Sequence, residues 1–286
     1  MRRSALRKGI VKNIINDIRR YTMSYFQSSR SNSFLGSLPE VTKNLLIINV
    51  LVWVATMIFK SKGVDFNQYL ALHFWQADRF MPWQLVTYMF MHDSSSLGGG
   101  LLHLGCNMFN LFMFGALLER VLGTKRYLLY YMVCGIGAGL VQEVVWQFTW
   151  ETEFVSNLRT ADGAVPSMAI VHQTIANGDA HTVEMMKEFL NFGFLTVGAS
   201  GAVFGLLLAF GMTFPNLKMY IIPFPFPIKA KWMVIGYGVF ELLCGTTGMM
   251  SGVAHYAHLG GMLFGVLLLL YWRQKGMLPK DGWYDY

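Results

Sequence analysis

The sequence GASG at residues 198–201 lies in Phe194–Phe214, a run of 21 almost entirely apolar and small residues. A helix of this length and composition can cross a bilayer. A second apolar run, Gly252–Trp272, carries AHLGG at residues 257–261, at nearly the same distance from its start. Two helices that run in the same direction would place Ser200 and His258 at one depth in the membrane. The sequence therefore predicts a hydroxyl nucleophile beside a histidine base.

The composition is that of a membrane protein and not of a soluble domain. Of 286 residues, 54% are hydrophobic and 14% are charged, whereas about 25% are charged in a typical soluble domain. The net charge of +7 does not indicate a nucleic-acid partner, because the lysines and arginines flank apolar runs and form no single basic patch. Cys106, Cys134 and Cys244 all fall inside apolar runs, so we expect no disulfide framework.

Six apolar runs predict an all-α bundle of six membrane helices within residues 44–272. The expected helices are 44–59, 101–118, 127–150, 194–214, 232–250 and 252–272. Residues 1–43 form a basic N-terminal segment, and residues 273–286 form a polar tail. The long connection 60–100 should end in a flexible Ser/Gly stretch at 94–100. In the other long connection, 151–193, His181–Phe192 has the pattern of a short amphipathic helix.

The distribution of lysine and arginine predicts the orientation of this bundle. The segments on the same side as the N-terminus carry 18 of these residues, and the opposite side carries 5. Cytoplasmic segments are enriched in positive charge, so both termini are expected in the cytoplasm. The second, fourth and sixth helices would then begin at the outer side. His103, Asn107, Ser200 and His258 lie in the first two turns of those helices and should meet just below the outer surface.

Small residues around Ser200 and His258 have two interpretations. Gly198 and Gly201 are typical of tightly packed membrane helices, so by themselves they indicate packing as readily as function. Gly261 belongs to a second glycine seam, which could pack against the first and bring His258 to Ser200. A serine hydroxyl becomes a good nucleophile when a base removes its proton. The outer half of the sixth helix has no Asp or Glu, so we expect a Ser–His pair without a carboxylate.

Other polar residues in or near these helices have candidate roles. His103 and Asn107 are four residues apart and share a helix face. As two donors they suit an oxyanion site, and the alternative is a hydrogen bond between helices. His255 is expected to have a structural or gating role. Two carboxylates complete the set: Glu119 should brace a helix end, and Glu241 needs a partner that the sequence does not identify, because a charge in an apolar helix is costly.

These features together resemble the rhomboid family of intramembrane serine proteases. The resemblance rests on GASG at 198–201, AHLGG at 257–261, the His103-x-x-x-Asn107 pair and the six-helix layout, and it covers roughly residues 44–272. It implies cleavage of a peptide bond in or beside the transmembrane helix of another protein. By the same resemblance, Ser200 attacks the carbonyl and His258 transfers the proton. The backbone N–H of Ser200, with His103 and Asn107, would hold the oxyanion.

The sequence departs from the family pattern at one position, and two alternative functions are considered. Trp83-Gln84 stands where the first loop of the family usually has Trp-Arg, which concerns the bracing of that loop and not the chemistry. An inactive relative that binds membrane clients would not need both Ser200 and His258. A histidine-based transporter would need carboxylates along a path through the whole bilayer, whereas here the polar groups gather at one end.

The resemblance sets the expected partners and location. The partners are transmembrane protein substrates and the lipid bilayer, and no cofactor or metal is needed, so a chelator should have no effect. The absence of a targeting sequence and the compact helical core favour a bacterial inner membrane. The sequence does not define an oligomeric state.

Overall fold

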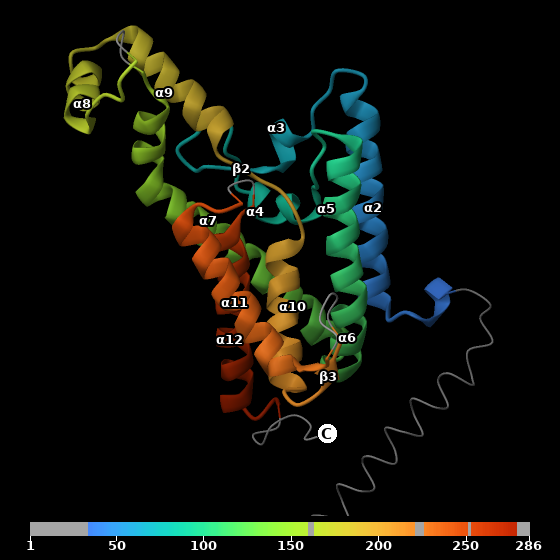
Figure 1. Ribbon diagram of the computed structural model, residues 1–286. Helices are drawn as coiled ribbons and strands as arrows, with labels where there is room; N and C mark the ends of the chain where they lie inside the picture. The colour runs from blue at the N-terminus through green and yellow to red at the C-terminus, as the bar shows by residue number, and fades with distance from the viewer. Residues whose placement is uncertain (1–33, 160–162, 221–225, 251–252, 279–286) are drawn as a thin grey trace, which may run out of the picture.

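The computed structural model describes residues 34–159, 163–220, 226–250 and 253–278, and they fold mainly into helices (Figure 1). Within these described residues, four helical segments are long and apolar enough to cross a membrane: α2 (Glu40–Lys60), the continuous segment Leu97–Leu122, α7 (Thr124–Asn157) and α12 (His255–Gln274). A shorter apolar helix, α10 (Ser200–Thr213), accompanies them. The expectations for residues 1–33 and 279–286 lie outside the described residues.

The expected second helix is longer than predicted and has three parts. It consists of α5 (Leu97–Asn110), a π-helical turn η3 (Leu111–Gly115) and α6 (Ala116–Leu122). The prediction of a flexible stretch at 94–100 was wrong for 97–100, which form the first turn of α5. Ser96 caps this turn by accepting a hydrogen bond from the Gly99 N–H at 3.1 Å. A β-carbon on Gly100 would lie 2.4 Å from the Asp93 carbonyl oxygen, so this glycine allows close packing.

The expected fourth helix starts six residues later than predicted. Leu195–Thr196 forms strand β2, which pairs antiparallel with β1 (Leu72–His73). Gly198 follows with φ of +129°, a conformation that breaks a helix and that favours glycine. The fifth and sixth helices, α11 (Ala230–Thr247) and α12, lie close to their expected positions. The late start makes Ser200 the first residue of α10.

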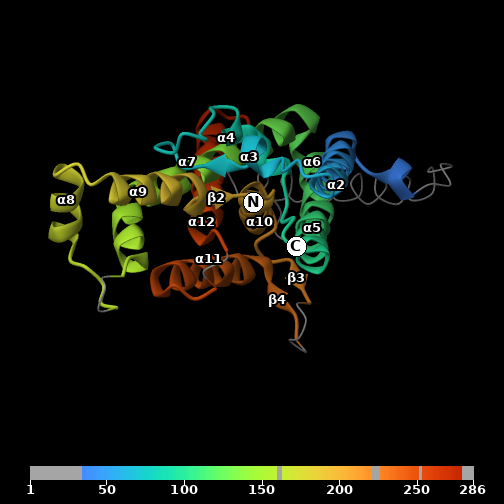
Figure 2. The same ribbon diagram turned by 90° about the horizontal axis from the view of Figure 1, so that it is seen from above.

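Short elements connect the long helices. α9 (Ala180–Gly193) confirms the helix expected at His181–Phe192, and α8 (Met168–Ala176) was not expected. Figures 1 and 2 show both projecting away from the bundle beyond the end of α7. The other elements are η1 (Phe34–Ser37), α3 (Asn67–Leu70), α4 (Gln84–Thr87), η2 (Tyr88–Phe90) and the paired strands β3 (Lys218–Met219) and β4 (Ile228–Lys229).

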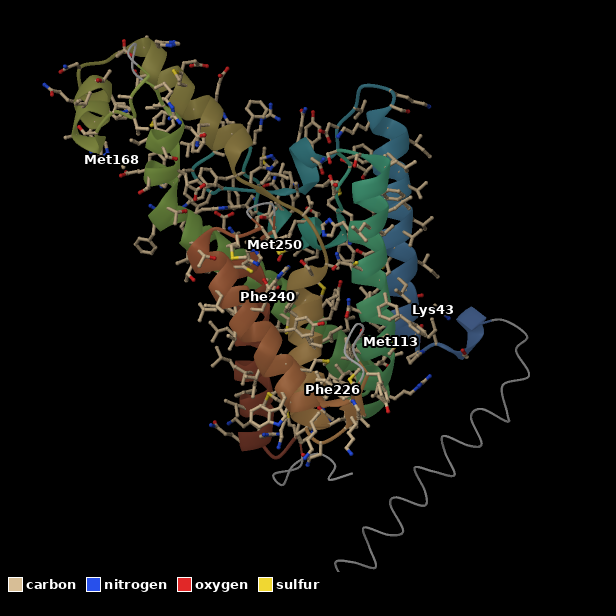
Figure 3. All side chains as sticks on the ribbon, in the orientation of Figure 1. Lys43, Met113, Met168, Phe226, Phe240 and Met250 are labelled. Atoms are coloured by element: carbon tan, nitrogen blue, oxygen red, sulfur yellow. The ribbon has the colours of Figure 1, made fainter. Side chains whose placement is uncertain are left out.

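Helix α10 lies at the centre of the bundle, with α7, α11, α12 and the α5–α6 segment around it (Figures 1 and 2). Most of its residues are buried, whereas the surrounding helices expose large apolar side chains such as Leu102, Phe109 and Leu243. Exposed apolar faces of this extent fit a protein that is surrounded by lipid. Figure 3 places Met250 at the end of the bundle where α10 begins and Phe226 at the opposite end.

Glu119 braces the start of α2, as a helix-end carboxylate was expected to do. The carboxylate accepts hydrogen bonds from the Val41 N–H at 3.0 Å and from the Thr42 N–H and hydroxyl, both at 2.8 Å. The side chain is buried. Negative charge near a helix N-terminus is favourable, because the first N–H groups have no partner within the helix. One side chain in α6 thus holds the beginning of α2.

Replacing Glu119 by alanine should lower the free energy of unfolding by about 2–3 kcal/mol, because hydrogen bonds to a buried charge are lost. Glu119→Gln keeps one acceptor oxygen and should lower the free energy of unfolding by less. Denaturant titration of the protein in mild detergent, followed by circular dichroism, would measure both. An unchanged unfolding midpoint in Glu119→Ala would show that the three hydrogen bonds contribute little to stability.

Candidate active site

The backbone before α10 presents Ser200 at a helix N-terminus. The Gly198 N–H donates to the Tyr88 carbonyl at 3.0 Å, which fixes the entry to the helix. The first bond at this helix end runs from the Val203 N–H to the Ala199 carbonyl. The N–H groups of Ser200 and Gly201 are therefore free of partners within the helix and point toward its N-terminal end. This end carries partial positive charge and suits a developing anion.

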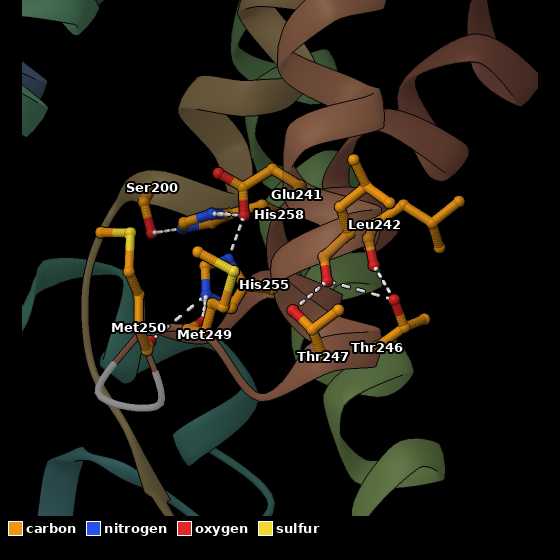
Figure 4. Close-up of polar contacts among 10 residues, drawn as sticks. Ser200, Glu241, Leu242, Thr246, Thr247, Met249, Met250, His255 and His258 are labelled. Carbon is orange, nitrogen blue, oxygen red and sulfur yellow. Dashed lines mark hydrogen bonds and ion pairs between the residues drawn. The ribbon is translucent and has the colours of Figure 1, made fainter.

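The structure brings Ser200 and His258 into direct contact, as the depth of the two apolar runs predicted. The Ser200 Oγ lies 2.8 Å from Nε2 of His258 (Figure 4). On the other side of the ring, Nδ1 lies 2.9 Å from Oε2 of Glu241. Because an ionised carboxylate only accepts hydrogen bonds, we assign the ring proton to Nδ1. Nε2 then accepts from the Ser200 hydroxyl, which is the tautomer that a general base requires.

Packing also fixes the plane of the His258 ring. The ring of Phe204 stacks on it, with centroids 4.1 Å apart and planes 9° from parallel. Phe204 lies one turn after Ser200 on α10, so the helix that supplies the hydroxyl also supports the imidazole. The position of α12 is set nearby by glycine, because a β-carbon on Gly261 would lie 1.9 Å from the Gly201 carbonyl oxygen. The two predicted glycine seams therefore pack against each other.

Glu241 is the site residue that the sequence did not place. The expected Ser–His pair without a carboxylate was wrong as a description of the geometry, because α11 brings Glu241 to His258. Oε2 of Glu241 also lies 2.6 Å from Nδ1 of His255. The other ring nitrogen of His255, Nε2, lies 3.1 and 3.2 Å from the carbonyl oxygens of Met249 and Met250. All three ionisable side chains are buried. The available signal was that a carboxylate in an apolar helix needs a partner, here in the next helix along the chain.

His103 lies beside Gly198, and its tautomer is also defined. The Asp93 N–H donates to Nδ1 of His103 at 3.2 Å, so Nε2 carries the proton and is a donor. A β-carbon at Gly198 would lie 2.9 Å from this Nε2 and 3.6 Å from the Ser200 Oγ. The space left by the missing side chain therefore lies between the histidine donor and the serine hydroxyl.

Asn107 follows His103 on the same helix, one turn further on. Its Nδ2 donates to the His103 carbonyl at 3.0 Å, and the side chain is buried. One of its two amide hydrogens is thus used within α5, and the second is available to another acceptor. This bond is within one helix, so it is not the hydrogen bond between helices that we considered as the alternative role.

The remaining predicted site residues lie away from the Ser200–His258 contact. Glu119 is in α6, the last part of the segment that begins with α5, and Trp83 is an exposed residue whose Nε1 donates to the Tyr69 carbonyl at 3.0 Å. Its neighbour Gln84 is fully buried. Gln84 accepts from the N–H groups of His73 and Met81 at 3.3 and 3.2 Å and donates to a carbonyl at 3.0 Å. The glutamine amide therefore braces the first loop without an arginine.

Glu241, His255 and His258 also form a group that could hold a metal ion, since their donor atoms lie within 4.8 Å of one another. The two closest separations, 2.6 and 2.9 Å, argue for protons between these atoms. Ligand atoms around a tetrahedral zinc at bond lengths near 2.0–2.1 Å would be about 3.3 Å apart. The spacing therefore fits hydrogen bonds better than a metal centre.

Comparison with known proteins agrees with this architecture. A family model of the rhomboid domain matches residues 79–275. Rhomboid protease AarA of Providencia stuartii is 25% identical over 255 residues, which are 84% of this chain and 74% of the relative. RHOMBOID-like protein 6, mitochondrial, of Arabidopsis thaliana is 25% identical over 266 residues, covering 91% of this chain and 58% of the relative.

A third relative, Rhomboid protein 1, mitochondrial, of Saccharomyces cerevisiae, is 28% identical over 189 residues, or 64% of this chain and 43% of the relative. The chain thus spans about half the length of the two mitochondrial relatives. Because the relatives include proteins named for mitochondria, they do not support the bacterial inner membrane that we expected. The family model covers more than half of the chain, and this chain therefore belongs to the rhomboid family.

Proposed function

We propose that this chain is an intramembrane serine endopeptidase that cleaves transmembrane segments of other membrane proteins. The observation that carries the proposal is the 2.8 Å contact between the Ser200 Oγ and Nε2 of His258. With the ring proton assigned to Nδ1, this Nε2 can accept the serine proton. A relative of this chain bears the name of a rhomboid protease. The geometry of this contact supports the nucleophile role for Ser200 and the base role for His258.

The proposed reaction proceeds through an acyl-enzyme. The Ser200 Oγ forms a bond to the carbonyl carbon, its proton passes to Nε2 of His258, and the carbonyl π electrons move to the oxygen. When this tetrahedral intermediate collapses, the C–N bond breaks and His258 gives its proton to the leaving amine. Water then attacks the ester, His258 takes its proton and returns it to Ser200, and the acid product leaves.

The oxyanion is proposed to form beside Gly198. Nε2–H of His103 and the Ser200 Oγ both border this space, and the Ser200 N–H is at the positive end of α10. Asn107 supplies a further amide donor on the same face of α5. Preorganised donors stabilise the charge of the tetrahedral intermediate without reorganising as it forms. Glycine at 198 leaves the room that the oxygen would need.

The proposed membrane arrangement uses six helical segments, close to those predicted within residues 44–272. These are α2, α5–α6, α7, α10, α11 and α12, with both chain termini in the cytoplasm and Ser200 near the outer face. This orientation follows from the excess of lysine and arginine on the N-terminal side. Water would reach the site from the outer side, where α10 begins. Transmembrane helices with small or helix-destabilising residues near that face would be the preferred substrates.

Reconstitution with model substrates tests the proposal. The protein would be placed in liposomes with single-span fusion proteins, and the products would be identified by mass spectrometry. Cleavage at one or a few bonds near the outer end of the span is expected. A substrate set that binds the wild-type protein and is recovered intact would instead support the binding-only alternative.

Replacing Asn107 by alanine should slow cleavage but not abolish it. Loss of one oxyanion donor typically lowers the rate by about 10²–10³-fold, and the other proposed donors remain. Steady-state kinetics with a cleaved reporter would show a lower kcat with little change in KM. A variant as inactive as Ser200→Ala would contradict this role and indicate that Asn107 is needed to maintain the site.

A further inference from the structure

We propose that Glu241 is a positioning residue for His258, so that Ser200, His258 and Glu241 form one hydrogen-bonded chain. This inference rests on the proposed protease function and adds a carboxylate to it. Glu241 comes from α11, whereas the serine and the histidine come from α10 and α12. The three groups are therefore assembled from three helices that are apart in sequence.

The geometry connects the carboxylate to the reacting hydroxyl through the imidazole. Oε2 of Glu241 accepts from Nδ1–H of His258 at 2.9 Å, and Nε2 of the same ring accepts from Ser200 at 2.8 Å (Figure 4). In the other tautomer, Nε2 would carry a hydrogen and could not take the serine proton. The carboxylate therefore selects the productive tautomer and fixes the direction of the ring.

The carboxylate also faces the charge that forms during the reaction. When the Ser200 proton passes to Nε2, His258 becomes an imidazolium with hydrogens on both nitrogens. Glu241 then accepts a charge-assisted hydrogen bond from Nδ1–H, and the proton stays on the ring. No proton is transferred to Glu241. The carboxylate stabilises the imidazolium until the leaving amine takes the proton from Nε2.

His255 explains how a carboxylate can be held in this apolar place. Its Nδ1 lies 2.6 Å from the same oxygen of Glu241, and its Nε2 faces the carbonyl oxygens of Met249 and Met250. Since both nitrogens face acceptors, the contacts fit the imidazolium form. In that form His255 would compensate the buried negative charge of Glu241. It also anchors Oε2, the same oxygen that His258 contacts.

A purely structural role for Glu241 is the competing explanation. In that case the carboxylate would serve His255 and the chain around Met249, and its contact with His258 would be incidental. The two roles predict different relative labelling rates for the variants. Glu241→Gln alters the contacts of the carboxylate with both His258 and His255, whereas His255→Gln alters only the contact between His255 and Glu241. Glu143→Gln is a matched control, since Glu143 is another buried carboxylate that accepts a backbone N–H, that of Trp75 at 2.9 Å.

The test is the rate of labelling of the detergent-solubilised protein by a fluorescent fluorophosphonate, which needs no protein substrate. Glu241→Gln should slow labelling by roughly 10²–10⁴-fold, the range that spans loss of a hydrogen-bonding group and loss of the triad carboxylate in serine proteases. His255→Gln should slow labelling much less, and Glu143→Gln should label at the wild-type rate. With a cleaved reporter, Glu241→Gln should lower kcat and leave KM unchanged. Its thermal unfolding midpoint should stay close to that of His255→Gln.

The possible failures can be told apart. A folded wild-type protein that is not labelled would overturn the protease function itself. Wild-type labelling with an unimpaired Glu241→Gln variant would overturn the role of Glu241 alone. Equal losses in Glu241→Gln and His255→Gln would assign the carboxylate to His255 instead. Faster wild-type labelling after treatment with a chelator would identify the group as metal ligands and also overturn the proposal.

Discussion

Ser200→Ala and His258→Ala are each expected to abolish fluorophosphonate labelling and proteolysis. Ser200→Ala removes the atom that forms the covalent bond. His258→Ala leaves the hydroxyl without the base at 2.8 Å that accepts its proton. Loss of the nucleophile or base in a serine protease lowers the rate on the order of 10⁶-fold, because the two groups act as a unit. Labelling in gels and cleavage of a reconstituted reporter would measure the loss.

Matched variants separate this effect from the general effect of substitution. Ser61→Ala and His172→Ala change exposed residues outside the site and should label normally. Size-exclusion profiles and unfolding midpoints would establish that Ser200→Ala and His258→Ala remain folded. Substantial proteolysis by either variant would contradict the assignment of nucleophile and base. Absence of labelling in a folded wild-type protein would favour the binding-only alternative.

The pairing of Ser200 with His258 was predictable because a membrane fixes depth. When two apolar helices of similar length enter the membrane from the same side, residues at equal distances from the helix starts lie at the same depth. The start of α10 was not predictable in the same way. Leu195 and Thr196 are apolar or small enough to continue a helix, but they pair with β1, more than 100 residues earlier. The break at Gly198 depends on its φ of +129°, which composition does not show.

Contacts between helices account for what the sequence left open at the site. Glu241 was identified as a buried charge, but its partners depend on how α11 rotates against α12. Gln84 illustrates the same limit, because its amide replaces an expected arginine through several contacts within one loop. In both cases the residue type indicated a need for hydrogen bonds. The identity of the partner followed only from the packing.

The packing of α10 against α12 leads to the second prediction. Gly261→Ala is expected to destabilise the protein and to abolish labelling. The new β-carbon would lie 1.9 Å from the Gly201 carbonyl oxygen and 2.7 Å from its carbon. These are backbone atoms of a helix, so no side chain can rotate away to make room. Overpacking typically costs about 1–3 kcal/mol and occasionally more, and a rigid contact of this kind should fall at or above the upper end.

Gly261→Ala should lose more labelling than its lower stability alone explains, because the helices that must separate are those that carry Ser200 and His258. A shift of about 1 Å at Gly261 would lengthen the contact between hydroxyl and imidazole beyond hydrogen-bonding distance. Gly236→Ala is the matched control: its β-carbon would meet no atom within 4 Å, and alanine favours a helix by up to about 1 kcal/mol. Gly236→Ala should therefore label normally and unfold no earlier than the wild type. Normal labelling by Gly261→Ala would show that α10 and α12 can separate without disturbing the site, contrary to the close packing that brings its two residues together.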